Sequence, residues 1–257
     1  MEEILVTGCI VTYNNLQTIE ETVTSVLAQT TGIAFQLYIV DNQSTDGTAQ
    51  LIRERFPQVQ LLERAQNEGF GAGHNVLLPL LDSDYHVIIN PDVLLRENAI
   101  GKMAAFLREN ADIGMVSPQI LDIQSGKEQI LGKRDPTLPF LLASRLRNRQ
   151  KPPGRLMRRY AMRDKPPDEL YDIENASGCF FVIRTALFRK IGGFDERFFL
   201  YFEDSDLSRR VRAEQRLVYY PQATVYHKWN RGSARELPLM WIHLKSMLYY
   251  FNKWRKD

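Results

Sequence analysis

Polar side chains follow three apolar runs of this chain, at the points where predicted strands end. The polar segments are residues 12–15 (Thr-Tyr-Asn-Asn), 41–47 (Asp-Asn-Gln-Ser-Thr-Asp-Gly) and 90–92 (Asn-Pro-Asp). Pro91 cannot donate a ladder hydrogen bond, so the β-branched run before it should end there. The carboxyl ends of parallel strands meet at one edge of a sheet, where open α/β folds bind ligands. We therefore expect a binding site for a polar ligand at this edge.

Asp92 and His227 are the candidate ligands of a divalent cation. A carboxylate at a strand end can hold a hard cation beside a phosphate, and imidazole suits cations of the Mn²⁺ type better than Ca²⁺. Each residue has an ordinary alternative, because Pro-Asp commonly forms a turn and a single histidine after an apolar stretch is commonly structural.

Asp41 and Asp46 belong to the second polar segment but are interpreted differently. Asp41 ends a core strand, which favours a ligand role over a turn cap, with its carboxylate accepting hydrogen bonds from a base or ribose. Asp46-Gly47 is typical of a turn, and we assign Asp46 to that turn.

A glycine-rich turn, residues 67–75 (Asn-Glu-Gly-Phe-Gly-Ala-Gly-His-Asn), leads into a predicted helix. Backbone N–H groups in such a turn can approach an anion closely. The glycine spacing is not that of the dinucleotide-binding fingerprint. A loop that only needs positive φ angles is the alternative.

Residues 203–206 (Glu-Asp-Ser-Asp) directly follow five apolar residues at 198–202. Acids at a helix start commonly cap the helix and favour its dipole, which accounts for Ser205 and Asp206. A carboxylate beside an aromatic wall has a raised pKa and can act as a general base. This chemistry is expected of Glu203 and Asp204.

The composition is that of an ordinary globular protein. The chain has 257 residues, of which 44% are hydrophobic and 25% charged, and a net charge of +2 gives no sign of nucleic-acid binding. The first residues lack a basic and apolar signal peptide, and no stretch approaches the roughly 18 apolar residues of a spanning helix. Cys9 and Cys179 are expected to be buried free thiols, so we expect a cytoplasmic protein.

Strands and helices alternate along the chain, which favours right-handed βαβ units and a mostly parallel, Rossmann-like sheet flanked by helices. The predicted strands are residues 4–12, 35–40, 59–63, 86–89, 177–183 and 217–220. The predicted helices are residues 18–29, 45–56, 71–81, 99–110, 184–191 and 207–214.

Two later segments are rich in basic residues. Residues 144–167 hold many arginines and are expected to form a mobile basic loop, either solvated or a patch for anionic lipid or a diphosphate-bearing acceptor. Residues 237–257 should form a C-terminal amphipathic helix, with Met240, Trp241 and Leu248 among its regularly spaced apolar residues. We expect this helix to pack on the domain, with a membrane-surface helix as the alternative.

The order of these motifs resembles the family 2 inverting glycosyltransferases of the GT-A fold, and most closely their bacterial rhamnosyltransferase-like branch. The resemblance extends from Ile4 to about Ser233 and rests on residues 12–14, 41–48, 67–71, 90–92, 177–180, 192–196, 202–207 and His227. No single motif is specific, but their common order is.

The resemblance implies a nucleotide-diphosphate-sugar donor, first dTDP-rhamnose and second a UDP-sugar, and a divalent metal, Mn²⁺ or Mg²⁺. Asp92 matches the last acid of the family's D-x-D metal motif, and His227 matches a histidine that joins the metal. Asn90 departs from the motif by replacing its first acid, which removes one carboxylate. Asp204 matches the catalytic base, with Glu203 beside it. The implied donor-binding residues are Thr12, Tyr13, Asn14, Asp41, Asn67, Gly69, Phe70, Gly71, Asn75 and Asn90.

The resemblance also implies one glycosyltransferase domain over residues 1–257. Residues 1–115 would bind the nucleotide-sugar, and residues 116–236 would bind the acceptor and carry the base. The expected acceptor is a lipid-linked or polysaccharide glycan of the bacterial cell surface, reached by peripheral contact with the anionic inner leaflet. A sugar nucleotidyltransferase and a non-catalytic sugar-nucleotide-binding or partner-binding module are the alternatives, and the oligomeric state is open.

Overall fold

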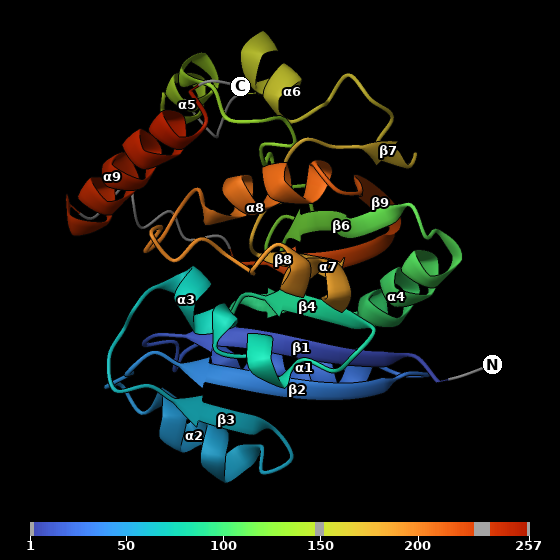
Figure 1. Cartoon of the computed structure of the whole chain (residues 1–257), viewed down its shortest axis with the longest axis vertical. Coiled ribbons are helices and arrows are strands. Elements are labelled where there is room, and N and C mark those ends of the chain that lie inside the picture. Colours follow the sequence, from blue (N-terminus) through green and yellow to red (C-terminus); the bar gives the residue numbers. More distant parts are fainter. Residues whose placement is uncertain (1–2, 147–151, 229–236, 256–257) are drawn as a thin grey trace.

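The computed structural model describes residues 3–146, 152–228 and 237–255. Its elements surround one mixed, mostly parallel sheet (Figure 1). The strand order is β3-β2-β1-β4-β8-β6-β9-β5, and β7 pairs with β9 outside this path. The α/β fold predicted from the alternation of strands and helices is confirmed.

The first half of the chain forms the parallel part of the sheet. Its strands are β1 (Leu5–Thr12), β2 (Ala34–Asp41), β3 (Gln60–Glu63) and β4 (Tyr85–Ile89). Alternate residues of β1 enter different cores, because Val6 and Ile10 pack on one face and Cys9 and Val11 on the other. Burial on both faces explains why these strands read as continuous apolar runs.

Helices cover both faces of this sheet (Figure 1). The first core is closed by α1 (Ile19–Gln29), α2 (Thr48–Arg55) and α4 (Ala99–Glu109). The second core is closed by α7 (Thr185–Lys190) and α8 (Glu203–Arg212), next to α3 (Phe70–Asn75) and the short 3₁₀ helix η1 (Leu78–Leu80).

The second half of the chain extends the sheet with strands of both directions. They are β5 (Val93–Leu94), β6 (Ile113–Asp122), β7 (Tyr171–Asp172), β8 (Phe180–Arg184) and β9 (Arg216–His227). β8 lies antiparallel between β4 and β6, and β6 is parallel to β9. β5 pairs with the end of β9, so Val93, two residues after Pro91, lies opposite His227, the last residue of β9.

Three helices lie together beyond the sheet, at the top of Figure 1. They are α5 (Leu138–Arg145), α6 (Arg155–Tyr160) and α9 (Leu237–Lys253). Phe140 of α5 stacks on Tyr160 of α6 with ring centroids 4.9 Å apart. Lys253 binds Asp195 and Asp206, so α9 is fastened to α8 and to the segment before it. The prediction of a C-terminal helix packed on the domain is confirmed.

Several predicted boundaries are wrong. The helix expected over residues 71–81 ends at Asn75, because the Asn75 side chain bonds the backbone of Phe194 and Pro79 enters η1. The helix expected from Leu207 begins at Glu203, which puts the acidic pair inside its first turn.

Two segments of the second half also differ from expectation. β6 was not predicted, and β9 continues from Tyr220 to His227 through Pro221, where the ladder changes register. The basic segment expected to be mobile contains α6, which is held by the buried side chains of Met157 and Tyr160. Residues 147–151 of that segment, and residues 229–236, lie outside the described residues.

Candidate active site

The carboxyl ends of β1 and β2 form a network of hydrogen bonds, here called the β1–β2 cluster. Thr12 Oγ1 donates to Asp41 Oδ1 over 2.8 Å, and the Ser44 backbone N–H donates to Asp41 Oδ2 over 2.8 Å. Asn14 adopts a φ of 56°, and its side-chain oxygen accepts from the Thr45 N–H over 2.8 Å. Asp41 is 2% exposed, so protein donors hold its carboxylate at the ligand edge of the sheet.

Asp46 closes the turn next to this cluster. Its carboxylate accepts from the backbone N–H groups of Leu16 and Thr48, each over 3.0 Å. The assignment of Asp46 to a turn is confirmed. The exposed ring of Tyr13 stands at the rim of the same edge.

The glycine-rich turn packs against the segment that precedes α8. The Phe70 N–H donates to the carbonyl of Phe199 over 3.0 Å, and a Cβ on Gly69 would lie 2.2 Å from that oxygen. Gly69 also has a φ of +99°, and its N–H donates to Asn67 Oδ1 over 3.0 Å. The close approach of the two backbones therefore requires glycine at this position.

Gly71 and Asn75 continue the same contact. A Cβ on Gly71 would lie 2.8 Å from the Cβ of Phe194. Asn75 Nδ2 donates to the Phe194 carbonyl over 2.8 Å, and Asn75 Oδ1 accepts from the Phe194 N–H over 2.8 Å. These residues fix the position of the segment before α8, and their contact with a donor stays a prediction.

Asn90, Asp92 and His227 meet beside the segment that precedes β8. The Asn90 N–H donates to the Cys179 carbonyl over 2.8 Å. Pairing of β5 with β9 sets Val93 opposite His227, and His227 Nε2 lies 3.3 Å from Asp92 Oδ1. The expected proximity of Asp92 and His227, which are far apart in the sequence, is confirmed.

Gln129 determines which nitrogen of the His227 ring carries the proton. Gln129 Nε2 donates to the His227 carbonyl over 2.8 Å, so Gln129 Oε1, 3.1 Å from His227 Nδ1, must accept. Nδ1 therefore carries a proton, and in the neutral ring the Nε2 lone pair faces Asp92. The 3.3 Å between His227 Nε2 and Asp92 Oδ1 would let both atoms bind one divalent cation.

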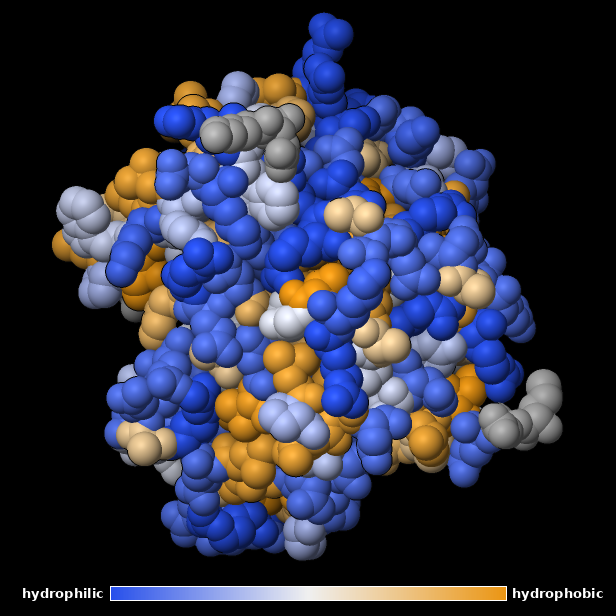
Figure 2. Space-filling model, viewed as in Figure 1, coloured by the Kyte–Doolittle hydropathy of each residue, from blue (hydrophilic) through white to orange (hydrophobic). Residues whose placement is uncertain are grey.

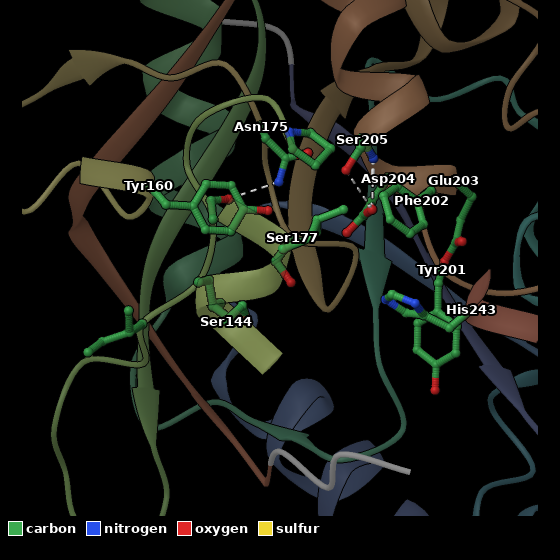
Figure 3. Close-up of a pocket in the computed structure, with 15 residues that line it drawn as sticks. Ser144, Tyr160, Asn175, Ser177, Tyr201, Phe202, Glu203, Asp204, Ser205 and His243 are labelled. Atoms are coloured by element: carbon green, nitrogen blue, oxygen red, sulfur yellow. Dashed lines mark hydrogen bonds between the residues drawn. The ribbon is translucent and has the colours of Figure 1, made fainter. Parts of the chain in front are cut away.

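A cavity of about 260 Å³, here called the α8 cavity, opens at the amino end of α8 (Figure 3). Figure 3 shows the Tyr160 ring and the Asp204 carboxylate on facing sides of this space, with Ser177 between them. Separate segments of the chain supply its polar lining, which includes Ser144, Tyr160, Asn175, Ser177, Asp204 and His243.

Asp204 is held in place by two backbone donors. The Gly178 N–H donates to Oδ2 over 2.9 Å, and the Ser205 N–H donates to Oδ1 over 2.7 Å. Burial raises the pKa of Asp204, and these hydrogen bonds, which lower it, only partly offset that effect. An oriented carboxylate with a raised pKa in a cavity has the properties of a general base.

Glu203 differs from its neighbour in its environment. It is buried, and among the described residues Glu203 Oε2 has no hydrogen-bond partner. Burial, and then the charge of Asp204, raise the pKa of Glu203 well above its usual range. Asp204 is therefore the carboxyl of this pair that ionises first.

The turn before α8 is strained. Tyr201 and Phe202 have φ angles of 70° and 68°, in the left-handed region that costs a non-glycine residue on the order of 1–3 kcal/mol. The buried ring of Phe202 packs on Tyr250 of α9, 5.4 Å away between centroids. The packing of α9 thus holds the conformation that directs Asp204 into the cavity.

Sequence reasoning missed Gln129, Tyr160, Asn175 and His243. Asn175 Nδ2 donates to the Gly132 carbonyl over 2.8 Å, while Asn175 Oδ1 has no partner among the described residues. Burial, and then Arg145, lower the pKa of His243. Helical spacing from Tyr250 could have placed His243 on the buried face of α9, but no local signal connects the other three to the site.

Comparison with known proteins identifies the family of this chain. The family model described as "Glycosyl transferase family 2" matches residues 8–192. The N-acetylglucosaminyl-diphospho-decaprenol L-rhamnosyltransferase of Mycobacterium tuberculosis is 28% identical over 228 residues, which cover 77% of this chain and 68% of that protein.

Two solved structures share the fold. The mannosyltransferase PcManGT from Pyrobaculum calidifontis, in complex with GDP-Man and Mn²⁺, aligns with a TM-score of 0.66 at 19% identity, over 98% of this chain and 64% of that one. GalNAc-T7 with UDP, GalNAc and Mn²⁺ aligns with a TM-score of 0.66 at 17% identity, over 89% of this chain and 45% of that one. The chain therefore spans less than two thirds of either solved chain, and the likeness identifies the GT-A fold.

Proposed function

Because the chain belongs to glycosyl transferase family 2, we propose that it is an inverting, metal-dependent glycosyltransferase with Asp204 as its base. The observation that carries this proposal is the placement of Asp204 and the Asp92–His227 pair on either side of residues 178–179. The Gly178 N–H bonds Asp204, and the next residue, Cys179, bonds Asn90. A base and a cation-binding pair next to one short segment suit a single displacement between them.

Asp204 would accept the proton of an acceptor hydroxyl as that oxygen attacks the anomeric carbon of the donor sugar. The nucleoside diphosphate would leave from the opposite face, toward Asp92 and His227. One displacement of this kind inverts the anomeric configuration. Glu203, which is buried and has a raised pKa, would stay neutral and keep a second negative charge away from the base.

Asp92 Oδ1 and His227 Nε2 would hold a divalent cation, Mn²⁺ or Mg²⁺. When bound, this ion would neutralise charge on the diphosphate leaving group. A carboxylate and an oriented imidazole suit Mn²⁺ in particular. Asn90 supplies no charge here, so the diphosphate oxygens would have to supply further ligands, which couples metal affinity to donor binding.

The donor would lie along the sheet edge with its base near Asp41 and with Thr12, Tyr13 and Asn14 around it. Its sugar is proposed to be L-rhamnose from dTDP-rhamnose, and a UDP-sugar is the second choice. The rhamnosyltransferase named above supports this choice, and it also supports a lipid-linked acceptor. If the acceptor is carried by a lipid, the enzyme must act at a membrane surface.

The test is the thermal unfolding of the purified chain with a panel of nucleotide-sugars, each with Mn²⁺, Mg²⁺ or EDTA. A ligand that binds only the folded state at 100 times its Kd stabilises it by about 2.7 kcal/mol. We expect dTDP-rhamnose to raise Tm with a metal and not with EDTA, and Asp92→Ala to remove this rise. If every donor leaves Tm unchanged with either metal, the proposal is wrong.

A further inference from the structure

Helix α5 carries an exposed stripe of leucines. Leu138, Leu142 and Leu146 are 60%, 60% and 74% exposed, and a spacing of four residues keeps them on one side of the helix. The other side faces the α8 cavity through Leu141 and Ser144. The helix thus separates the cavity from an apolar outer surface.

Helix α9 repeats this arrangement. Leu237, Trp241 and Leu248 are 70%, 68% and 66% exposed, and intervals of four and seven residues place them in one stripe. Ser246 and Tyr250 are buried on the opposite side. Trp241 and Leu248, expected from their spacing to belong to a packed face, therefore lie outside it.

The two stripes belong to neighbouring helices. Leu141 of α5 packs in the same cluster as Tyr250 of α9, and Arg145 Nη2 donates to Met240 Sδ over 3.2 Å. Figure 2 shows hydrophobic side chains along the upper left edge of the molecule, over α5 and α9. The six exposed side chains, here called the α5–α9 stripe, border the helices that line the α8 cavity.

The charge around the stripe is mainly positive, with Asp164 beside the α6 arginines as an exception. None of α5, α6 and α9 contains an aspartate or glutamate. On α6, the exposed Arg155, Arg158 and Arg159 are paired with no carboxylate of the described residues, and they line a hollow of about 610 Å³. Lys245 is exposed between Trp241 and Leu248 on α9.

We propose that the α5–α9 stripe and the α6 arginines form one surface that docks on an anionic lipid bilayer. Leucine and tryptophan side chains would enter the boundary between headgroups and acyl chains, and the arginines would meet lipid phosphates. Two copies of this surface would oppose cation to cation, which disfavours self-association through it. Among the described residues no helix is long and apolar enough to cross the bilayer, so the contact is superficial.

This orientation places the α8 cavity directly behind the two helices that would touch the membrane. The same two helices contribute Ser144 and His243 to the cavity lining, beside Asp204. If the proposed function holds, a lipid-linked acceptor reaches Asp204 along the membrane surface, and its lipid stays in the bilayer.

The test is co-sedimentation of the full chain with vesicles of phosphatidylcholine alone or with a large fraction of phosphatidylglycerol. We expect binding to the anionic vesicles only, and weaker binding as salt is raised. The triple variant L142Q/W241Q/L248Q and the triple variant R155Q/R158Q/R159Q should each lower the partition coefficient at least tenfold. If the unaltered chain stays in the supernatant with both vesicle types at low salt, the proposal is wrong.

Matched controls lie elsewhere on the surface. Leu80 of η1 is 52% exposed, and L80Q should leave the partition coefficient unchanged. The exposed arginines Arg53, Arg55 and Arg108 allow a triple control, R53Q/R55Q/R108Q, with the same change of charge. Equal losses in the control and test variants would overturn the docking surface.

Two further readouts separate this proposal from others. The rise of Tm with nucleotide-sugar and metal should be the same in both test variants, so a loss of vesicle binding with this rise intact concerns the surface alone. If size exclusion shows a dimer that L142Q/W241Q/L248Q dissociates while vesicle binding persists, the stripe is a self-interface and the proposal is wrong.

Discussion

Most polar side chains at the ends of β1 and β2 bond one another, whereas Glu203 and Asn175, around the amino end of α8, each have an oxygen without a partner among the described residues. In the β1–β2 cluster, both carboxylate oxygens of Asp41 accept protein hydrogen bonds. In the α8 cavity, Glu203 Oε2 and Asn175 Oδ1 accept none from the described residues. Unpaired buried polar atoms cost about 1–3 kcal/mol each, so the α8 cavity, with two such oxygens, gives up more stability than the β1–β2 cluster, which has one among the described residues, Asn42 Oδ1.

The difference indicates that the two regions have different functions. The β1–β2 cluster holds Asp41 in place without a ligand and offers a preformed edge for a nucleotide, with one buried oxygen, Asn42 Oδ1, that has no partner among the described residues. Both regions contain non-glycine residues with positive φ, Asn14 and Gln43 in the first and Tyr201 and Phe202 in the second. The α8 cavity adds raised carboxyl pKa values and two unpaired oxygens, which are typical of a reactive centre. Altering the first region should therefore affect binding and folding, and altering the second should affect turnover.

Asp204→Asn should have the largest effect. The amide keeps the shape of the side chain but cannot take a proton at neutral pH, so kcat should fall by about a thousandfold. The Kd for donor and metal should stay unchanged, because Asp204 belongs to the other region. Transfer assays and calorimetry on the same preparation measure both, with the exposed Asp168→Asn as the control. A normal kcat in Asp204→Asn would show that Asp204 is not the base.

Gly69→Ala tests the contact that joins the two regions. The new Cβ would meet the Phe199 carbonyl at 2.2 Å, at a φ of +99°, so we expect a loss of about 3 kcal/mol in the free energy of unfolding. Gly32→Ala is the control, because Gly32 also has a positive φ but open space around it. It should cost only about 1–2 kcal/mol in chemical denaturation. Equal losses in the two variants would mean that the contact with Phe199 is unimportant.

Gln129→Leu tests how the metal pair is oriented. Without the Gln129 amide, His227 loses the hydrogen bonds that direct its Nε2 toward Asp92, and loss of such an outer partner typically lowers metal affinity 10–100-fold. Titration with Mn²⁺ in the presence of nucleotide-sugar measures the change. Gln215→Leu, which removes a half-buried amide that donates to the Ala111 carbonyl, serves as the control. Unchanged Mn²⁺ affinity in Gln129→Leu would contradict the tautomer deduced for His227.

Glu203→Gln should have the smallest effect, and it should depend on pH. A carboxyl whose pKa is raised by folding stabilises the fold below its unfolded pKa and loses that contribution as pH rises through the folded pKa. The amide has no such loss, so the variant should gain on the unaltered chain between pH 5 and pH 8. A gain of about 1 kcal/mol would raise Tm by roughly 2–4 °C.

Differential scanning calorimetry at the two pH values would measure this gain. Exposed Glu169→Gln should leave Tm unchanged at both. If the Tm difference between Glu203→Gln and the unaltered chain is the same at pH 5 and pH 8, folding does not raise the pKa of Glu203.

The two regions also differ in how far the sequence predicts them. Strands β1, β2 and β4 were predicted because buried apolar runs and short turns are local signals. In the second half, Pro118 and Pro221 lie inside β6 and β9 at an irregular register, so both strands look interrupted in the sequence. Helix α6 was missed because only Met157 and Tyr160 anchor it within a basic segment.

The same limit applies to the candidate site. Asp92, Asp204 and His227 each stand at the end of an apolar run, which a single pass along the sequence can find. Gln129 and Tyr160 become part of the site only through tertiary packing, since their partners lie 98 residues away at His227 and across the cavity at Asp204.

The anomeric configuration of the first product tests the central claim most directly. The chain would be given a nucleotide-sugar of known configuration, Mn²⁺ and an acceptor, and the new glycosidic bond would be assigned by NMR. A single displacement assisted by Asp204 predicts that the configuration is inverted. A product that retains the donor's configuration would require two displacements and would contradict the account.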